Sequence, residues 1–148
     1  MQWVGDVSQV GGVERLRIRE GLQGGVEVVQ VRTGTGLSFE VLLSRGMDIG
    51  RIAYRGIPLA WCSPTGPVAP CHFDPRDTGW LRSFHGGLVA TCGLTTAGAP
   101  STDAGEELGL HGRISHIPAR ETFVGGQWQG DDYVLRGEGK MREAGVFG

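Results

Sequence analysis

Glycine is the residue type that most constrains the fold of this chain, because it occupies 27 of the 148 positions. The glycines do not recur at every third residue, as a collagen helix would require. They stand singly and in pairs between short apolar runs, and glycine is the residue that tight turns most often need. No segment shows three or four turns of helical periodicity. The sequence therefore predicts an all-β chain of short strands joined by turns.

Alternation of apolar and polar residues locates the strands. Leu16 and Ile18 alternate with arginines in the first run, which is the period expected of a half-buried strand. The earlier strands are expected at 13–20, 26–33, 37–43, 51–54 and 57–61, with tight turns at 34–36 and 55–56. The later strands are expected at 87–92, 120–124, 127–129 and 133–142, with loops at 63–78 and 95–107 and turns at 125–126 and 130–132. The expected architecture is an antiparallel sandwich, or part of a larger one.

Length, composition and charge exclude several classes of protein. The chain suits one domain, and its 39% hydrophobic and 20% charged residues are typical of a globular protein. Its net charge of −2 comes without a basic stripe, so no nucleic-acid partner is expected. No apolar stretch approaches the ~20 residues of a membrane-spanning helix, so no membrane association is expected either.

The three cysteines bear on location and on metal binding. The N-terminal residues lack the charged start and apolar core of a signal peptide, and the cysteines are odd in number. We therefore expect reduced thiols in a cytoplasmic protein. Cys62, Cys71, His72 and Cys92 could be drawn as a zinc set, but the paired short spacings of zinc sites are missing. Neither a metal nor another cofactor is expected.

Three glycine-flanked clusters carry the side chains most suited to chemistry. They occupy residues 44–50, 79–87 and 109–113, where glycines would let a ligand approach the main chain closely. Together they supply fork-shaped donors, imidazoles, a carboxylate and an indole face, which suit a sugar site. Their candidate residues are Arg45, Asp48, Trp80, Arg82, His85, His111 and Arg113.

Each cluster also has a purely structural interpretation. Arg45 and Asp48 suit a turn-stabilising ion pair as well as substrate contacts. Trp61 and Trp80 are more typical of a core than of a binding platform, and His85 could simply bond a loop carbonyl. His111 is the exception, because an imidazole among glycine-containing turns is hard to explain by packing, and its pKa range suits proton transfer near neutrality.

Four sequence runs resemble a known family. RGMDIG at 45–50, FHGGL at 84–88, TCGL at 91–94 and LHGR at 110–113 are similar to a branch of the aldose 1-epimerase (galactose mutarotase-like) superfamily. The resemblance covers nearly the whole chain. It implies an antiparallel β-sandwich of the supersandwich type, of which residues 1–148 would form the N-terminal part of a single domain.

The resemblance also implies a function. Members of the superfamily are isomerases that interconvert sugar anomers by acid/base ring opening, and the general acid is a histidine whose context His111 matches. The small-molecule ligand would then be an aldose or a derivative. His85 stands where an arginine commonly precedes the paired glycines, and Arg82 is expected to take that arginine's place. The implied sugar contacts are Arg45, Asp48, Trp80, Arg82, His85 and Arg113.

Complete members of the superfamily continue well beyond residue 148. Their base glutamate lies in that later part, so the resemblance implies a fragment that is inactive alone. Two other interpretations stay open: a carbohydrate-binding or sensing module without catalysis, and an inert fragment with exposed sheet edges. Self-association is expected, because unpaired edges are usually covered by pairing.

Overall fold

A computed structural model describes residues 4–146 of the chain, and these residues are almost entirely strands and loops. Within this part there is no α-helix, and the helical segments are 3₁₀ turns of three to five residues. The all-β prediction is confirmed. The 3₁₀ turns are η1 (Val7–Gln9), η2 (Gly21–Gln23), η3 (Pro70–His72), η4 (Gly79–Ser83) and η5 (Ile114–His116). The strands are β1 (Gly12–Arg17), β2 (Glu27–Arg32), β3 (Leu37–Leu42), β4 (Asp48–Tyr54), β5 (Ile57–Pro58), β6 (Ser101–Asp103), β7 (Glu106–Leu108), β8 (Arg120–Gln129) and β9 (Asp132–Lys140).

The first five strands form one antiparallel sheet in sequence order. The predicted hairpin at 34–36 joins β2 to β3, and Thr33 donates its N–H to Leu37 O across it. Gly34 and Gly36 have positive φ there, which is why the link needs glycine. The predicted turn at 55–56 joins β4 to β5.

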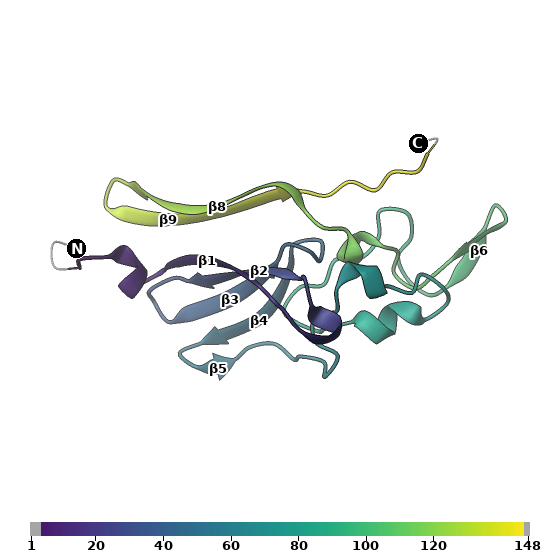
Figure 1. The fold of residues 1–148 in the computed structure, drawn as a ribbon, viewed down its shortest axis with the longest axis horizontal. Coiled ribbons are helices and arrows are strands. Elements are labelled where there is room, and N and C mark those ends of the chain that lie inside the picture. Colours follow the sequence, from purple (N-terminus) through teal and green to yellow (C-terminus); the bar gives the residue numbers. More distant parts are fainter. Residues whose placement is uncertain (1–3, 147–148) are drawn as a thin grey trace.

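One face of this sheet packs against the β8–β9 hairpin, which lies along it in Figure 1. The core between the two layers is aliphatic, so the sandwich forms here by burial of apolar surface. Its buried members are Val29, Val31 and Leu43, and Val13, Phe39, Val41, Met47, Val124 and Leu135 pack around them.

The other face carries a second, smaller core. Val26, Val28, Leu42 and Ala69 form it, with Ile18 packed against them. The side chains of β2 and β3 contribute alternately to the two cores, because successive side chains of a strand point to opposite faces. Ala69 covers part of this face, and an open groove lies beside it.

Three predictions about individual segments are wrong. Gly125 and Gly126 do not turn but pair with Arg136 and Leu135 inside the β8–β9 ladder. An added Cβ at Gly126 would lie 2.7 Å from the Tyr133 ring, so glycine lets that ring lie across the strand. The loop expected at 95–107 contains the short β6–β7 hairpin.

The strand expected at 87–92 is reduced to a single isolated bridge between Val89 and Ile49. Its ladder cannot continue, because the N–H of Thr91 donates to the side chain of Asp48 at 2.7 Å. Gly86 and Gly87 also have positive φ, which is incompatible with extended strand geometry.

Two further observations concern surfaces. Cys62, Cys71 and Cys92 are exposed free thiols. In the described residues, no helix has the length and hydrophobicity needed to cross a membrane. The expected domain boundary and the expected self-association stay predictions.

Candidate functional site

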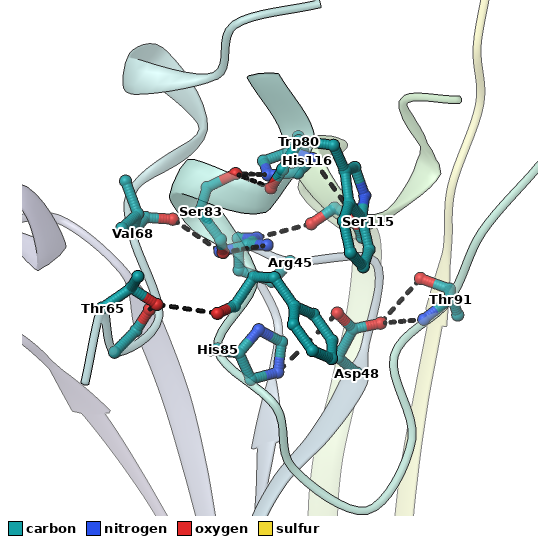
Figure 2. A network of polar contacts seen from close by, with 12 residues as sticks. Arg45, Asp48, Thr65, Val68, Trp80, Ser83, His85, Thr91, Ser115 and His116 are labelled. Atoms are coloured by element: carbon teal, nitrogen blue, oxygen red, sulfur yellow. Dashed lines mark hydrogen bonds and ion pairs between the residues drawn. The ribbon is translucent and has the colours of Figure 1, made fainter. Parts of the chain in front are cut away.

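Arg45 organises a polar cluster at the end of the sheet, where β3 turns into β4 (Figure 2). It lies in the turn after β3 and is 1% exposed. Its guanidinium donates to three backbone carbonyls from separate loops: Ser115 O at 2.6 Å, Val68 O at 2.8 Å and Ser83 O at 3.2 Å. Burial lowers the pKa of Arg45 to about 10, so it remains a cation. These bonds give Arg45 a structural role, tying loops together.

Asp48 begins β4 on the face that it shares with its cross-strand partner Leu42. It is fully buried, and its Oδ1 accepts both the N–H of Thr91 and the hydroxyl proton of Thr91 at 2.6 Å. Burial raises the pKa of Asp48 to about 6, against the opposing effects of Thr91 and the Arg45 charge. Its Oδ2 has no hydrogen-bond partner among the described residues.

His85 faces that free oxygen (Figure 2). Its Nε2 lies 3.9 Å from Asp48 Oδ2, and its side chain is 4% exposed. Neither ring nitrogen of His85 has a hydrogen-bond partner in the described chain. Burial, helped by the Arg45 charge, lowers the pKa of His85 to about 4, so the imidazole is neutral at physiological pH.

The two glycines after His85 hold it close to the sheet. A Cβ at Gly86 would lie 2.5 Å from Trp61 O, and one at Gly87 would lie 2.6 Å from Ile49 O. The motif therefore needs glycine for a close approach of two backbones, as well as for its positive φ.

A closed chain of hydrogen bonds surrounds His116 on the other side of Arg45 (Figure 2). Trp80 Nε1–H donates to Ser115 Oγ at 3.2 Å, and the Ser83 hydroxyl donates to Trp80 O at 3.1 Å. Because the only Ser83 hydroxyl proton is used there, His116 Nε2–H is the donor in the 2.7 Å contact with Ser83 Oγ. Its Nδ1 then accepts from Ser115 at 3.0 Å. Burial, helped by the charge of Arg45, lowers the pKa of His116 to about 3.

A groove of about 520 Å³ lies on the sheet face that carries Asp48, and His85 is one of its walls. Its size is within the range of small-molecule sites. Apolar side chains of β1, β2 and β3 and a row of polar side chains both line it. The charged and polar members include Arg17, Gln23, Gln30, Glu40, Arg51, Ser63 and His85, and the apolar ones include Leu16, Ile18, Val28 and Leu42.

Glu40 and Arg51 form a bidentate ion pair across β3 and β4. Arg51 Nε lies 3.0 Å from Glu40 Oε2, and Arg51 Nη2 lies 2.7 Å from Glu40 Oε1. The pair raises the pKa of Arg51 above its ordinary value. Gln30 is the cross-strand partner of Glu40, so three polar side chains follow one another across the sheet.

The remaining predicted residues lie away from the groove's lining. Trp80 is 6% exposed and stacks on Phe84 with ring centroids 4.7 Å apart, so it packs as a core residue. Arg82 is exposed on the surface. Arg113 is also exposed and pairs with Glu143 at 3.2 Å.

His111 has a defined place in the loop structure. Its φ of 58° is left-handed, its Nδ1 accepts the N–H of Gly98 at 3.2 Å, and its ring meets the Trp80 ring edge-on at 4.9 Å. Accepting at Nδ1 puts the proton on Nε2. These contacts fix a loop, and the role of His111 as a general acid stays a prediction.

No group of three or more potential metal ligands occurs among residues 4–146.

The sequence did not predict the part that Gln30, Glu40 and Arg51 play in the groove, or the hydrogen bonds of His116. Alternation within 37–43 puts Glu40 on the face opposite Phe39 and Val41, but only the strand register brings it beside Gln30 and Arg51.

The comparisons with known proteins agree with this architecture. Among curated proteins, none matches the sequence. A crystal structure of a "putative aldose 1-epimerase" from Klebsiella pneumoniae subsp. pneumoniae MGH 78578 is similar, with 27% sequence identity and a TM-score of 0.82. The similarity covers 90% of this chain and 35% of that one. Residues 23–148 match the family described as "Domain of unknown function (DUF4432)". The chain therefore belongs to the DUF4432 family.

Proposed function

We propose that this chain binds an aldose or aldose derivative in the groove over β1–β4, as part of an aldose 1-epimerase-like isomerase. The observation that carries the proposal is the composition of the groove, where a row of polar side chains stands beside an aliphatic floor. Sugars present hydroxyl groups on their edges and CH groups on their faces, and this lining offers partners for both. The similarity to a "putative aldose 1-epimerase" supports the same ligand class.

In this proposal Gln30 and Arg51 hold sugar hydroxyl groups, and His85 contacts the ligand from the groove wall. Gln30 offers both an acceptor and donors. Arg51 Nη1 is not used by Glu40 and is free to donate. His85 is the histidine that lines the groove, so it is the structural candidate for proton exchange with the ligand. The family resemblance implies His111 as the general acid, and the experiment below compares the two histidines.

A non-catalytic sugar-binding role is the second candidate. The observation that favours it concerns Glu40, the carboxylate in the groove's lining, because both of its oxygens are engaged by Arg51. A carboxylate held in this way is already engaged and does not offer a free oxygen to a sugar hydroxyl group. Binding without turnover in a full-length relative would support this role, because the 148-residue chain is expected to be inactive alone under either candidate.

Two measurements on the 148-residue chain test the proposal. Saturation-transfer NMR with D-galactose, D-glucose and D-mannose detects binding, and polarimetry of a freshly dissolved single anomer detects interconversion. We expect binding to weaken in Gln30→Ala and His85→Gln but not in Gln127→Ala, a control on the exposed end of β8. The acid role is tested in a full-length relative that interconverts anomers, where loss of interconversion on replacing the histidine equivalent to His111, but not the one equivalent to His85, would return that role to His111. If none of these aldoses binds, or if the groove variants bind as the wild type does, the proposed site is wrong.

A further inference from the structure

We propose that Asp48 is a positioning residue that acts through His85: it holds the Nε2–H tautomer, so that His85 Nδ1 is a hydrogen-bond acceptor for a ligand hydroxyl group. The inference rests on the proposed function for the identity of the ligand, but the tautomer is a property of the free chain. In this arrangement Asp48 acts through His85 and is not itself a direct sugar contact. Both side chains are more than nine-tenths buried, and His85 lines the groove. Its Nδ1 is covered in the free chain, so a ligand hydroxyl group reaches this atom only when the ring moves.

The two oxygens of Asp48 have different surroundings. Oδ1 is held by two bonds from Thr91, at 2.7 Å from its N–H and at 2.6 Å from its hydroxyl. These bonds fix the carboxylate plane and leave Oδ2 with His85 Nε2 at 3.9 Å. A small movement of the imidazole closes that distance to a hydrogen bond, and contacts at binding sites often tighten when a ligand arrives.

An ionised carboxylate can only accept hydrogen bonds, so Asp48 favours the tautomer with a proton on Nε2. The neutral imidazole then has its lone pair on Nδ1. An acceptor at this position discriminates between ligands, because a hydroxyl group can donate to it whereas a carbonyl or ether oxygen cannot. The pair therefore selects a polyhydroxylated ligand at this wall of the groove.

The charged neighbours agree with a neutral His85. Arg45 lies close to His85 and lowers its pKa, and His85 in turn disfavours protonation of His116. Arg17, Glu40 and Arg51 share the groove's lining with His85. Arg17 is exposed to solvent, and Glu40 and Arg51 neutralise each other in their ion pair. Asp48 is thus the negative group that faces the ring, and the one that sets which nitrogen carries the proton.

The arrangement predicts a change of tautomer in the wild-type chain. Asp48 takes up a proton below about pH 6, while His85 stays neutral down to about pH 4. In that window the proton on Oδ2 makes Asp48 a donor, so His85 Nε2 becomes the acceptor and the ring proton moves to Nδ1. Imidazole ¹⁵N shifts, measured on histidine-labelled chain without any sugar, distinguish the two tautomers.

Asp48→Asn should cause the same change of the His85 tautomer at neutral pH. The amide oxygen can keep both Thr91 bonds, and the amide NH₂ then faces His85 as a donor. We expect the ring proton on Nδ1 in this variant and on Nε2 in the wild type. Asp131→Asn, in the exposed turn between β8 and β9, is the matched control and should leave His85 unchanged. In Asp48→Asn the dissociation constant for D-galactose should rise by about tenfold or more, because the acceptor is lost.

The pH series needs no substitution, so the inference is tested even if Asp48→Asn fails to fold. An Nδ1–H tautomer in the wild type at neutral pH would overturn it. A tautomer that does not change as Asp48 takes up its proton would also overturn it. Failure of every aldose to bind would count against the proposed function alone, since the ¹⁵N measurement is made without a ligand.

Discussion

The free energy of unfolding should fall as the pH is lowered from about 6 to about 4, and His85 and His116 should drive that change. His116 is buried with a pKa of about 3, against 6.5 for an ordinary histidine. Between these values the unfolded chain binds a proton that the folded chain does not. The same holds for His85 between 6.5 and about 4. Both groups therefore destabilise the fold on acidification.

Asp48 has the opposite effect. Its pKa is about 6 in the folded chain and 3.8 when unperturbed, so in this interval the folded state binds the extra proton. Two histidines acting against one carboxyl leave a net uptake of one proton on unfolding. That corresponds to about 1.4 kcal/mol per pH unit, or about 3 kcal/mol over the window. Hydrogen bonds with Ser8 and Arg76 lower the pKa values of Asp6 and Asp74 from 3.8, so both carboxyl groups titrate below this pH window.

His116→Gln removes one of the two histidine contributions. The remaining effects of His85 and Asp48 then nearly cancel, so the slope of unfolding free energy between about pH 4 and pH 6 should approach zero. Urea unfolding followed by tryptophan fluorescence at several pH values measures this slope. His72→Gln, at an exposed histidine, is the control and should keep the wild-type slope.

A His116→Gln variant that loses stability on acidification as steeply as the wild type would contradict this role of His116. The variant should also be less stable at neutral pH, because Ser83 and Ser115 lose a partner, but that offset does not affect the slope. If the variant does not fold, an NMR titration of the wild type decides the matter: a His116 ring that protonates near pH 6.5 in the folded chain would contradict its burial effect.

Three further substitutions test the frame of the site. Gly87→Ala should cost several kcal/mol and lower the melting temperature sharply, because its Cβ would lie 2.6 Å from Ile49 O, whereas Gly137→Ala, with open space around it, should cost about 1 kcal/mol or less. Leu43→Ala should cost about 2–5 kcal/mol in urea unfolding, since Leu43 is 2% exposed, while Leu94→Ala, 66% exposed, should be near neutral. Arg45→Met should cost about 3–5 kcal/mol, because the carbonyls of Val68, Ser83 and Ser115 lose their donor, and equal stability in the variant would deny Arg45 its structural role.

The sheet could be predicted from the sequence because its signals are local. The alternation around Leu16 and Ile18 and the glycines at 34–36 each report on a few neighbouring residues, and β1, β2 and β3 lie close to where they were expected. The paired glycines at 125–126 misled for the same reason. They resemble a turn in isolation, and only the Tyr133 ring on the opposite strand explains why glycine is needed there.

The site was predictable only in part, because its geometry depends on contacts between distant segments. Sequence reasoning selected Arg45, Asp48 and His85 as polar groups beside glycines, and the structure brings these three together. It could not separate their roles, since the carbonyls that occupy Arg45 come from residues 68, 83 and 115. Gln30 and Arg51 gave no signal beyond a place on a strand.

The distribution of satisfied and unsatisfied polar atoms connects the frame to the groove. Arg45, Ser83, Ser115 and His116 use their polar atoms on one another and on the backbone, which ties together the segments around Arg45. Among the described residues, the buried side-chain atoms left without partners are Asp48 Oδ2, both ring nitrogens of His85 and Glu143 Oε2. Leaving such atoms unpaired costs stability, so a fold retains them where they serve another purpose. Three of these four atoms lie in one pair of side chains, and the histidine of that pair forms a wall of the groove. The cost is therefore concentrated in the pair of side chains that we propose as the contact for a ligand hydroxyl group.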